Sequence, residues 1–229
     1  MCGRFALKET PKKLSEHFKL AAEVDFSPAY NIAPSLPIYM ITADTSDARL
    51  MRKMRWGLIP SWAKDAAIGN KLSNARGESV AEKPSFRSAF KARRCIIPAS
   101  GFYEWQAVNK TKQPWYISLR SGEPMAFAGI WETWHPQEGE PIETCCIITT
   151  AGNELMQPIH DRMPVVLNPE NWAQWLSPTE RNPDTLLPLI HPHDSALMQA
   201  WPASKELNKV GMRNDAGLTQ PLPPTSLFD

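Results

Sequence analysis

The sequence has few cysteines and no long apolar run. Its four cysteines, Cys2, Cys95, Cys145 and Cys146, show no Cys-X-X-Cys spacing, which argues against a metal site and favours reduced thiols. No apolar stretch reaches the roughly 18 residues that a membrane-spanning helix needs. The opening residues MCGRFALKET lack the apolar segment of a signal peptide. We therefore expect a cytoplasmic protein with no membrane partner, no metal and no cofactor.

Repeats and linkers are also missing. The 229 residues contain no internal repeat and no Gly/Ser-rich segment between two domains, which suits a single domain. Hydrophobic residues make up 42% and charged residues 21% of the chain, so it can build a core and wholesale disorder is not expected. The 22 prolines predict many irregular connections.

Short segments of strand character dominate the sequence. Strands are expected at 38–42, 48–59, 94–99, 101–108, 113–120, 125–134 and 144–150. Helices are expected at 9–22, where Thr10 and Pro11 provide the N-terminal cap, at 85–94 and at 168–176. Loops are expected at 26–37 and 60–79. This order predicts an α+β fold: one domain dominated by antiparallel strands, closed into a barrel, with short flanking helices.

The charges are unevenly distributed along the chain. Residues 1–120 contain 20 Lys+Arg and 10 Asp+Glu, a balance of +10, whereas residues 121–229 contain 5 and 14, a balance of −9. Such asymmetry suggests a basic face for an anionic partner, most often nucleic acid. Alternatively the two halves interleave in space and their charges pair. Charge alone leaves both interpretations open.

The position of Cys2 suggests a chemical role. Aminopeptidases commonly remove an initiator methionine that precedes a small residue, which would leave Cys2 with a terminal amine beside its thiol. The reference pKa of an α-amine is near 8, so roughly a tenth or more of it is neutral at physiological pH. An aminothiol converts an aldehyde first into a Schiff base and then into a five-membered thiazolidine. A buried or incidental cysteine is the simpler interpretation, and Cys2 alone does not decide.

Three further segments carry polar residues suited to a site. Asn74 and Arg76 place an amide beside a guanidinium in a polar loop. Glu104 shares a strand face with Phe102, so its carboxylate should be partly desolvated and suited to acid–base work. His160 follows the last strand and carries the side chain best suited to proton transfer near neutral pH. The simpler alternatives are an ordinary loop, an exposed glutamate and a structural histidine.

Two other groups are interpreted mainly as structural. The run from Lys83 to Arg94 carries five cations and no acid, with Phe86 and Phe90 interleaved. Its pattern predicts an amphipathic helix whose phenylalanines face the core, while some of its cations face an anionic partner. His191 and His193 form a His-X-His pair without a third ligand nearby and are interpreted as loop residues.

Several of these segments belong to an ordered set of motifs. The set is MCGRF at 1–5, YNIAP at 30–34, RWGLIPSWAKD at 55–65, NARGES at 74–79, KPSFRSAFKARRCIIPASGFYEW at 83–105, IITTAGN at 147–153 and IHDRMPVVL at 159–167. Together the motifs resemble the SRAP family, also called SOS-response-associated peptidases. The resemblance continues to PASKELNKVGMRND and implies an SRAP-like domain over residues 1–215, followed by a Pro-rich tail at 216–229.

The resemblance implies a reaction with damaged DNA. Cys2, after removal of Met1, is expected to form a thiazolidine with the C1′ aldehyde of an abasic site in single-stranded DNA, which shields the lesion. Asn74 is expected to hold the sugar or the α-amine. Glu104 and His160 are expected to manage protons during ring opening and imine formation.

The resemblance also implies how DNA is held. Arg4, Arg76 and Arg162 are expected to bind flanking phosphates, and Trp62 to stack on or wedge beside a base. These roles agree with the chemistry of the residues, because arginine forks suit phosphates and aromatic platforms with basic grooves hold single strands. The expected partner is single-stranded DNA containing abasic sites, bound by a monomer that associates with the nucleoid after DNA damage.

Other functions remain open at this point. Cys2, His160 and Asn74 imitate the Cys-His-Asn set of a thiol peptidase acting in trans, and self-removal of N-terminal residues is implied by the resemblance. A non-covalent reader of modified bases would bind DNA without a covalent step. A third alternative is lyase activity, because the Schiff base can drive β-elimination before the thiol closes the ring.

Overall fold

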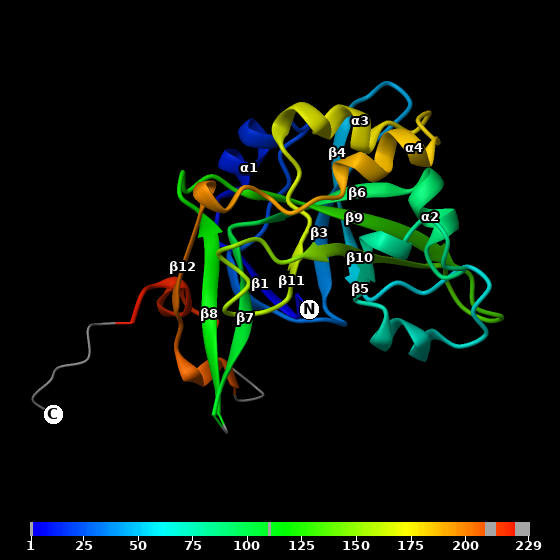
Figure 1. Cartoon of the computed structure of the whole chain (residues 1–229). Coiled ribbons are helices and arrows are strands. Elements are labelled where there is room, and N and C mark those ends of the chain that lie inside the picture. Colours follow the sequence, from blue (N-terminus) through cyan, green and yellow to red (C-terminus); the bar gives the residue numbers. More distant parts are fainter. Residues whose placement is uncertain (1, 110, 209–213, 223–229) are drawn as a thin grey trace, which may run out of the picture.

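The computed structural model describes residues 2–109, 111–208 and 214–222 (Figure 1). Its strands are β1 (Arg4–Leu7), β2 (Ala29–Ile32), β3 (Pro37–Ala43), β4 (Arg49–Trp56), β5 (Asn74–Arg76), β6 (Arg94–Ala99), β7 (Gly101–Val108), β8 (Thr111–Leu119), β9 (Met125–Trp134), β10 (Ile142–Ala151), β11 (Arg162–Pro164) and β12 (Met198–Pro202). Its α-helices are α1 (Pro11–Phe18), α2 (Arg87–Ala92), α3 (Trp172–Leu176) and α4 (Pro183–Leu186). Short 3₁₀ turns occupy several of the connections.

Five strands close into a barrel. β3 pairs with β4 and with β6, β6 pairs with β9, and β9 pairs with β10, all antiparallel. The ring closes through a parallel pairing of β10 with β4 at Thr144 and Arg55. The expectation of a barrel-like α+β fold dominated by antiparallel strands is therefore confirmed, and β10 pairs in parallel with its neighbours β4 and β5.

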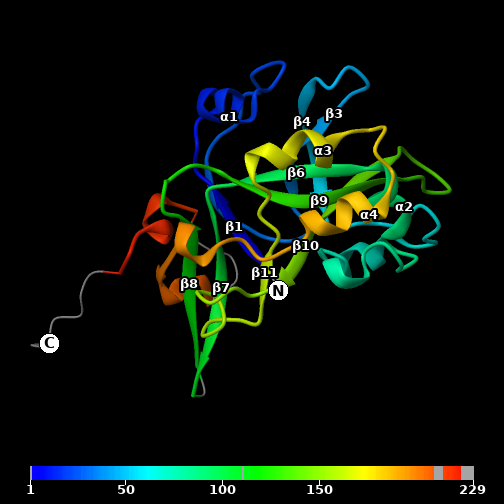
Figure 2. The same ribbon diagram turned by 45° about the horizontal axis from the view of Figure 1, so that its top comes forward.

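A second sheet packs against the barrel. Its strand order is β12-β8-β7-β1-β2, and the β7–β8 hairpin forms its centre. Figure 1 and Figure 2 show this hairpin extending away from the barrel, while α1, α3 and α4 lie over the opposite end of the molecule. Phe5 and Phe102 from this sheet both meet Phe127 of the barrel, at centroid distances of 6.1 and 6.0 Å. Edge-to-face pairs of this kind contribute about 0.5–1.5 kcal/mol beyond the area they bury.

The C-terminal half of β10 extends the barrel wall. β5 pairs with it in parallel, with Asn74 opposite Ile147, and β11 pairs with it on the other side, with Arg162 opposite Ala151. The two short strands thus continue the positions that β4 and β9 hold along the first half of β10. Residues 74 and 162, which are 88 positions apart in sequence, thus lie on the two strands that flank the C-terminal half of β10.

Gly57 controls the turn that leads from β4 towards β5. Its φ of +139° belongs to a region that L side chains rarely adopt, and a Cβ there would lie 2.5 Å from the carbonyl oxygen of Gly69. Its main-chain N–H donates to Cys145 of β10, which anchors the turn to the barrel. Glycine is required because the two chain segments approach so closely.

Most expected elements are found, with two corrections. Thr10 caps α1 by accepting from the main-chain N–H of Lys13, as predicted, but the helix ends at Phe18 because Lys19 turns to φ 52°. The expected loop at 26–37 is wrong at β2, since an edge strand forms there against β1. The expected loop at 60–79 is wrong at β5. Both strands are short and depend on tertiary pairing, which the local sequence does not reveal.

The end of the described chain also packs. Leu218 is fully buried against Tyr103, Tyr116 and Leu207 on the outer face of the second sheet. The 3₁₀ turn at Ala216–Thr219 is therefore attached to the body of the protein, and residues 223–229 of the expected tail lie outside the described residues. No helix among the described ranges is long and apolar enough to cross a membrane.

Candidate functional site

Four residues expected to be catalytic come together beside the second sheet. Cys2 precedes β1, Asn74 begins β5, Glu104 lies in β7, and His160 lies in the connection between β10 and β11. Asn74 Nδ2 donates to the main-chain carbonyl oxygen of Cys2 at 2.8 Å. His160 Nε2 lies 4.0 Å from Glu104 Oε2, and the charge of Glu104 acts on the Cys2 thiol. Segments from four distant parts of the sequence thus converge on one place.

The Cys2 side chain is completely buried while Met1 is still attached. Its exposed fraction is 0%, and its Sγ lies 4.0 Å from the carbonyl oxygen of Arg4. Burial raises the pKa of the Cys2 thiol far above its ordinary value, and the negative charge of Glu104 raises it further. The thiol is therefore protonated at neutral pH, so a thiolate nucleophile is disfavoured in this state.

Asn74 offers a second hydrogen-bonding atom at the same place. Its neighbour Ala75 is buried in the core, so the strand alternation turns Asn74 and Arg76 to the other face of β5. Within the described part of the chain, Asn74 Oδ1 is buried and has no hydrogen-bond partner. A buried acceptor without a donor is costly, and such atoms call for a functional explanation.

Glu104 is buried beside an apolar wall. Its exposed fraction is 3%, and it shares its strand face with Phe102, which belongs to the core cluster that also contains Cys2. The expected desolvation of Glu104 is confirmed, and the alternative of an exposed glutamate is wrong. Tyr103 and Trp105 occupy the opposite side of β7, as the alternation predicts.

The contacts of His160 limit its proton positions. The main-chain N–H of Arg162 donates to Nδ1 at 3.0 Å, and a ring that accepts this bond carries its proton on Nε2, which faces Glu104. Nδ1 also lies 2.9 Å from Asp161 Oδ1. A hydrogen bond to that oxygen needs a proton on Nδ1, so Nδ1 can accept from Arg162 or donate to Asp161 but cannot do both at once.

An open pocket of about 620 Å³ lies over two members of this group, Glu104 and His160. Arg4, Glu104 and His160 line it, together with Trp105, Lys112, Leu207 and Asn208. Arg4 Nη1 donates to Asn31 Oδ1 at 2.6 Å, which orients the guanidinium at the edge of the pocket. Arg4 thus lines the same pocket as Glu104 and His160.

The other expected DNA-binding residues differ in availability. Arg76 is exposed. Arg162 is 13% exposed and binds both carboxylate oxygens of Glu78, at 2.5 and 2.9 Å, and the carbonyl oxygen of Thr149 at 2.8 Å. This ion pair lowers the pKa of Glu78 through the Arg162 hydrogen bond. A phosphate must therefore compete with Glu78 for Arg162.

Trp62 lies apart from this pocket. Its side chain is 57% exposed, and its indole N–H donates to the carbonyl oxygen of Pro84 at 3.2 Å. It lines a separate hollow with Lys64 and Lys71. The structure therefore presents Trp62 as an exposed ring beside two cations, and Trp62 does not line the pocket over Glu104 and His160.

The basic run at 83–94 is mostly structural. Phe86 and Phe90 are buried in the core, as expected. Arg93 pairs with Glu132, and Arg94 is buried. Arg94 donates to the main-chain carbonyl oxygens of Phe90, Lys91, Trp175, Ser177 and Glu180. Only the cations of Lys83, Arg87 and Lys91 remain exposed in this run.

The remaining cysteines and histidines do not join the site. Cys95, Cys145 and Cys146 are buried unpaired thiols. Across residues 2–109, 111–208 and 214–222, no cluster of three or more His, Cys, Asp or Glu side chains could hold a metal ion. His193 is buried at the foot of a different hollow with Trp172.

Sequence reasoning missed several residues of the site. Asn31 orients Arg4, and Glu78 holds Arg162. Asn31 lies in the motif YNIAP and Glu78 in the motif NARGES, so membership in these motifs was the signal that could have found them. Lys112 and Asn208 line the pocket from the outer strand and the C-terminal region, and no local pattern marks them.

The fold and site define a class: a small α+β barrel protein with a buried cysteine at position 2, surrounded by an amide, a carboxylate and an imidazole beside an open pocket. The model of the SOS response associated peptidase (SRAP) family matches residues 1–210. The chain therefore belongs to the SRAP family.

Relatives with assigned names agree on one kind of lesion. Abasic site processing protein YoqW of Bacillus subtilis is 49% identical over 91% of this chain and 94% of its own length. Abasic site processing protein HMCES of Xenopus tropicalis is 34% identical over 73% of this chain and 59% of its own length. A crystal structure of a protein from Bacteroides thetaiotaomicron superposes with a TM-score of 0.86, at 28% identity, over 97% of this chain and 100% of that one.

Proposed function

We propose that this protein processes abasic sites in single-stranded DNA by forming a covalent thiazolidine through Cys2 after removal of Met1. The bond shields the lesion in a protein–DNA crosslink. The observation that carries the proposal is the contact of Asn74 with the Cys2 carbonyl, in a site that also holds Glu104 and His160 beside an open pocket. The printed names of the relatives support the choice of lesion.

The proposed reaction is balanced without a cofactor. The α-amine of Cys2 attacks the C1′ aldehyde of the opened deoxyribose, and loss of one water gives the imine. The thiol then adds to the imine carbon, its proton passes to the nitrogen, and the five-membered ring closes. Because the adding group is adjacent to the imine, closure is intramolecular and is favoured by proximity.

The neighbouring residues have distinct tasks in this scheme. Asn74 fixes the Cys2 carbonyl with Nδ2, and its Oδ1 accepts a hydrogen bond from the new amine or from the sugar. Glu104 takes a proton from the amine and returns it to the departing oxygen. His160 donates from Nε2 to the sugar oxygen during ring opening. Arg4, Arg76 and Arg162 bind phosphates of the same strand.

The electrostatics of Cys2 disfavour a thiol peptidase that acts in trans. Such an enzyme needs a thiolate stabilised by a nearby imidazolium. Here burial and the charge of Glu104 both raise the pKa of the thiol. The proposed scheme needs no thiolate, because the thiol reacts in its neutral form and only after the imine has formed. Self-removal of Met1 would need a thiolate in the same buried state and is disfavoured for the same reason, whereas strand cleavage from the imine is a side activity of the same site.

The proposal is tested by intact-protein mass spectrometry and denaturing gels. Wild type incubated with single-stranded DNA carrying an abasic site should give the mass of both components, without Met1 and minus one water. Cys2→Ala should give no stable adduct, and Cys2→Ser should give an imine that only borohydride traps. Cys146→Ala, at a buried thiol in a different core cluster from Cys2, should crosslink like wild type. A heat-stable adduct with Cys2→Ala would refute the thiazolidine.

A further inference from the structure

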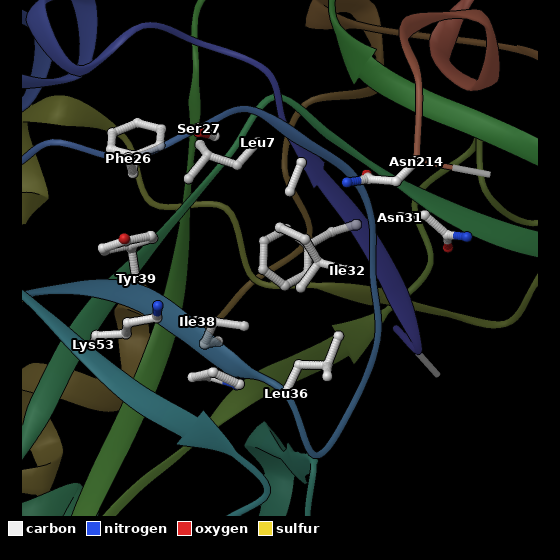
Figure 3. Close-up of a pocket in the computed structure, with 13 residues that line it drawn as sticks. Leu7, Phe26, Ser27, Asn31, Ile32, Leu36, Ile38, Tyr39, Lys53 and Asn214 are labelled. Atoms are coloured by element: carbon white, nitrogen blue, oxygen red, sulfur yellow. The ribbon is translucent and has the colours of Figure 1, made fainter. Parts of the chain in front are cut away.

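A second hollow of about 340 Å³ lies beside β1 and adjoins the site (Figure 3). Arg4 connects the two hollows: it lines the pocket over Glu104, and it donates to Asn31, which lines the second hollow. Small-molecule sites in proteins usually have volumes of about 300–1,000 Å³, so this space suits a group the size of a base or nucleoside.

The walls of the hollow are apolar and aromatic. Figure 3 shows the rings of Phe26 and Tyr39 across from Ile32, with Leu36 at one end. The two rings are 5.1 Å apart and inclined by 40°. Leu36 is 48% exposed, so the apolar lining reaches the surface and is accessible from solvent. Apolar and aromatic walls of this kind hold flat, unstacked bases.

A cation stands at the mouth of the hollow. Lys53 Nζ lies 5.4 Å from the centroid of the Tyr39 ring, and Lys53 forms no ion pair with any residue in the described ranges. Its neighbours on β4 are engaged differently: Arg52 pairs with Glu143, and Arg55 donates to the Asn70 side chain. Lys53 is therefore available for a phosphate.

We propose that this hollow receives the nucleobase of the nucleotide next to the abasic site, while Lys53 binds a phosphate of this neighbouring nucleotide. The inference rests on the proposed function. A base beside an abasic sugar has lost one stacking partner, so its extrusion from the strand costs less than elsewhere. Asn214 lies at the edge of the hollow, where its Oδ1 accepts from the main-chain N–H of Tyr30, and its Nδ2 can donate to a base edge. The occupied hollow would hold the strand while the sugar lies over Cys2.

The test compares strands that differ only beside the lesion. One strand carries 2-aminopurine at both positions that flank the abasic site. The second strand carries baseless spacers at the same two positions. In both strands the abasic position is a tetrahydrofuran analogue without an aldehyde, so fluorescence anisotropy with the wild-type protein measures affinity without a covalent step. Stacking of a base on a protein ring changes affinity measurably, so the base-bearing strand should bind roughly fivefold tighter or more. Its 2-aminopurine should also be protected from acrylamide quenching.

Two variants locate the effect. Ser27→Trp starts from an exposed side chain at the hollow and fills it, so it should remove both the preference and the protection. Lys53→Gln should weaken binding of the base-bearing strand and keep the fold, since its side chain is exposed. Lys12→Gln on α1 is the matched control and should change neither readout, because Lys12 pairs only with Glu16 at the surface. Thermal unfolding verifies that each variant folds.

The outcomes separate this inference from the proposed function. If wild type crosslinks but both strands bind equally and 2-aminopurine stays accessible, the hollow is not a base site and the proposed function stands. If the preference persists in Ser27→Trp and Lys53→Gln, the base binds elsewhere and the inference is wrong. Failure of wild type to crosslink in the mass measurement would overturn the proposed function instead.

Discussion

The side-chain amide of Asn74 donates to the carbonyl oxygen of Cys2 at 2.8 Å and joins the first residues of the chain to β5, 72 positions later. The contact fixes the backbone of Cys2 rather than its thiol. Because β5 is itself held by β10, the position of the N-terminus is set by the barrel. A terminal residue, which is usually among the more mobile parts of a domain, is thereby given a defined place.

Asn74→Ala should slow crosslinking because it releases the Cys2 carbonyl and removes the buried Oδ1 acceptor. We expect a loss of about 10²-fold in the single-turnover rate, the lower part of the range for a positioned polar group. Ser73→Ala is the control: Ser73 Oγ receives only the longer 3.2 Å contact from Asn74, so its rate should stay within about twofold of wild type. Equal rates for both variants would show that the amide does not position Cys2.

Glu104→Gln and His160→Gln should reduce the rates of proton transfer while leaving single-strand affinity nearly unchanged. Loss of one such group typically costs about 10²–10⁴-fold. We expect Glu104 to serve imine formation in both directions, so Glu104→Gln should also make a formed crosslink longer-lived, whereas His160→Gln should affect mainly ring opening. Forward and competitor-chase time courses measure this. His135→Ala, at an exposed position, should match wild type, and rates within about twofold for both site variants would contradict the assignment.

Single-strand affinity should fall with salt at a log–log slope of roughly −2 if three arginines each hold a phosphate, since each contact contributes about −0.7. Arg76→Ala should flatten the slope by a little under one unit, because Arg76 is exposed and ready to bind. Lys12→Ala, on the surface of α1, should leave it unchanged. Titrations between low and moderate salt measure the slope. A salt-independent affinity would mean that the charge asymmetry of the sequence is only structural.

Arg94→Ala should destabilise the fold, because Arg94 is 4% exposed and donates to five main-chain carbonyl oxygens from two separate segments. Truncation leaves these acceptors buried without a donor, and we expect the free energy of unfolding to fall by on the order of 3 kcal/mol. Arg87→Ala, at an exposed position on α2, should change the free energy of unfolding by less than about 0.5 kcal/mol. Urea unfolding measures both. An equally small change in the free energy of unfolding for Arg94→Ala and Arg87→Ala would show that solvent replaces the buried hydrogen bonds of Arg94.

Much of the fold follows from local sequence. The alternation in 94–150 predicts β6, β7, β8, β9 and β10, and Thr10 with Pro11 predicts the start of α1. The same alternation places Glu104 beside Phe102 and therefore predicts its burial. These features are set by neighbours in the chain, through side-chain periodicity and capping.

The tertiary structure decided what local pattern could not. β2 and β5 are strands only because β1 and β10 present edges to them. The sequence marks Arg162 as a candidate for phosphate binding, but only the fold brings Glu78 against it across 84 positions. Likewise Arg94 lies in a basic run, yet the packing of α3 and the segment after it turns Arg94 into a buried structural group.

The sequence by itself determined the chemical inventory: a cysteine at position 2, an amide, a carboxylate, an imidazole, and a basic first half. It also determined the strand periodicity that makes a barrel of this chain. Only the tertiary structure decided that these groups meet, which groups face each ring nitrogen of His160, and which arginines remain exposed. The physical reason is that strand pairing and ion pairing join residues far apart in the chain, and such long-range contacts leave no trace in the local pattern.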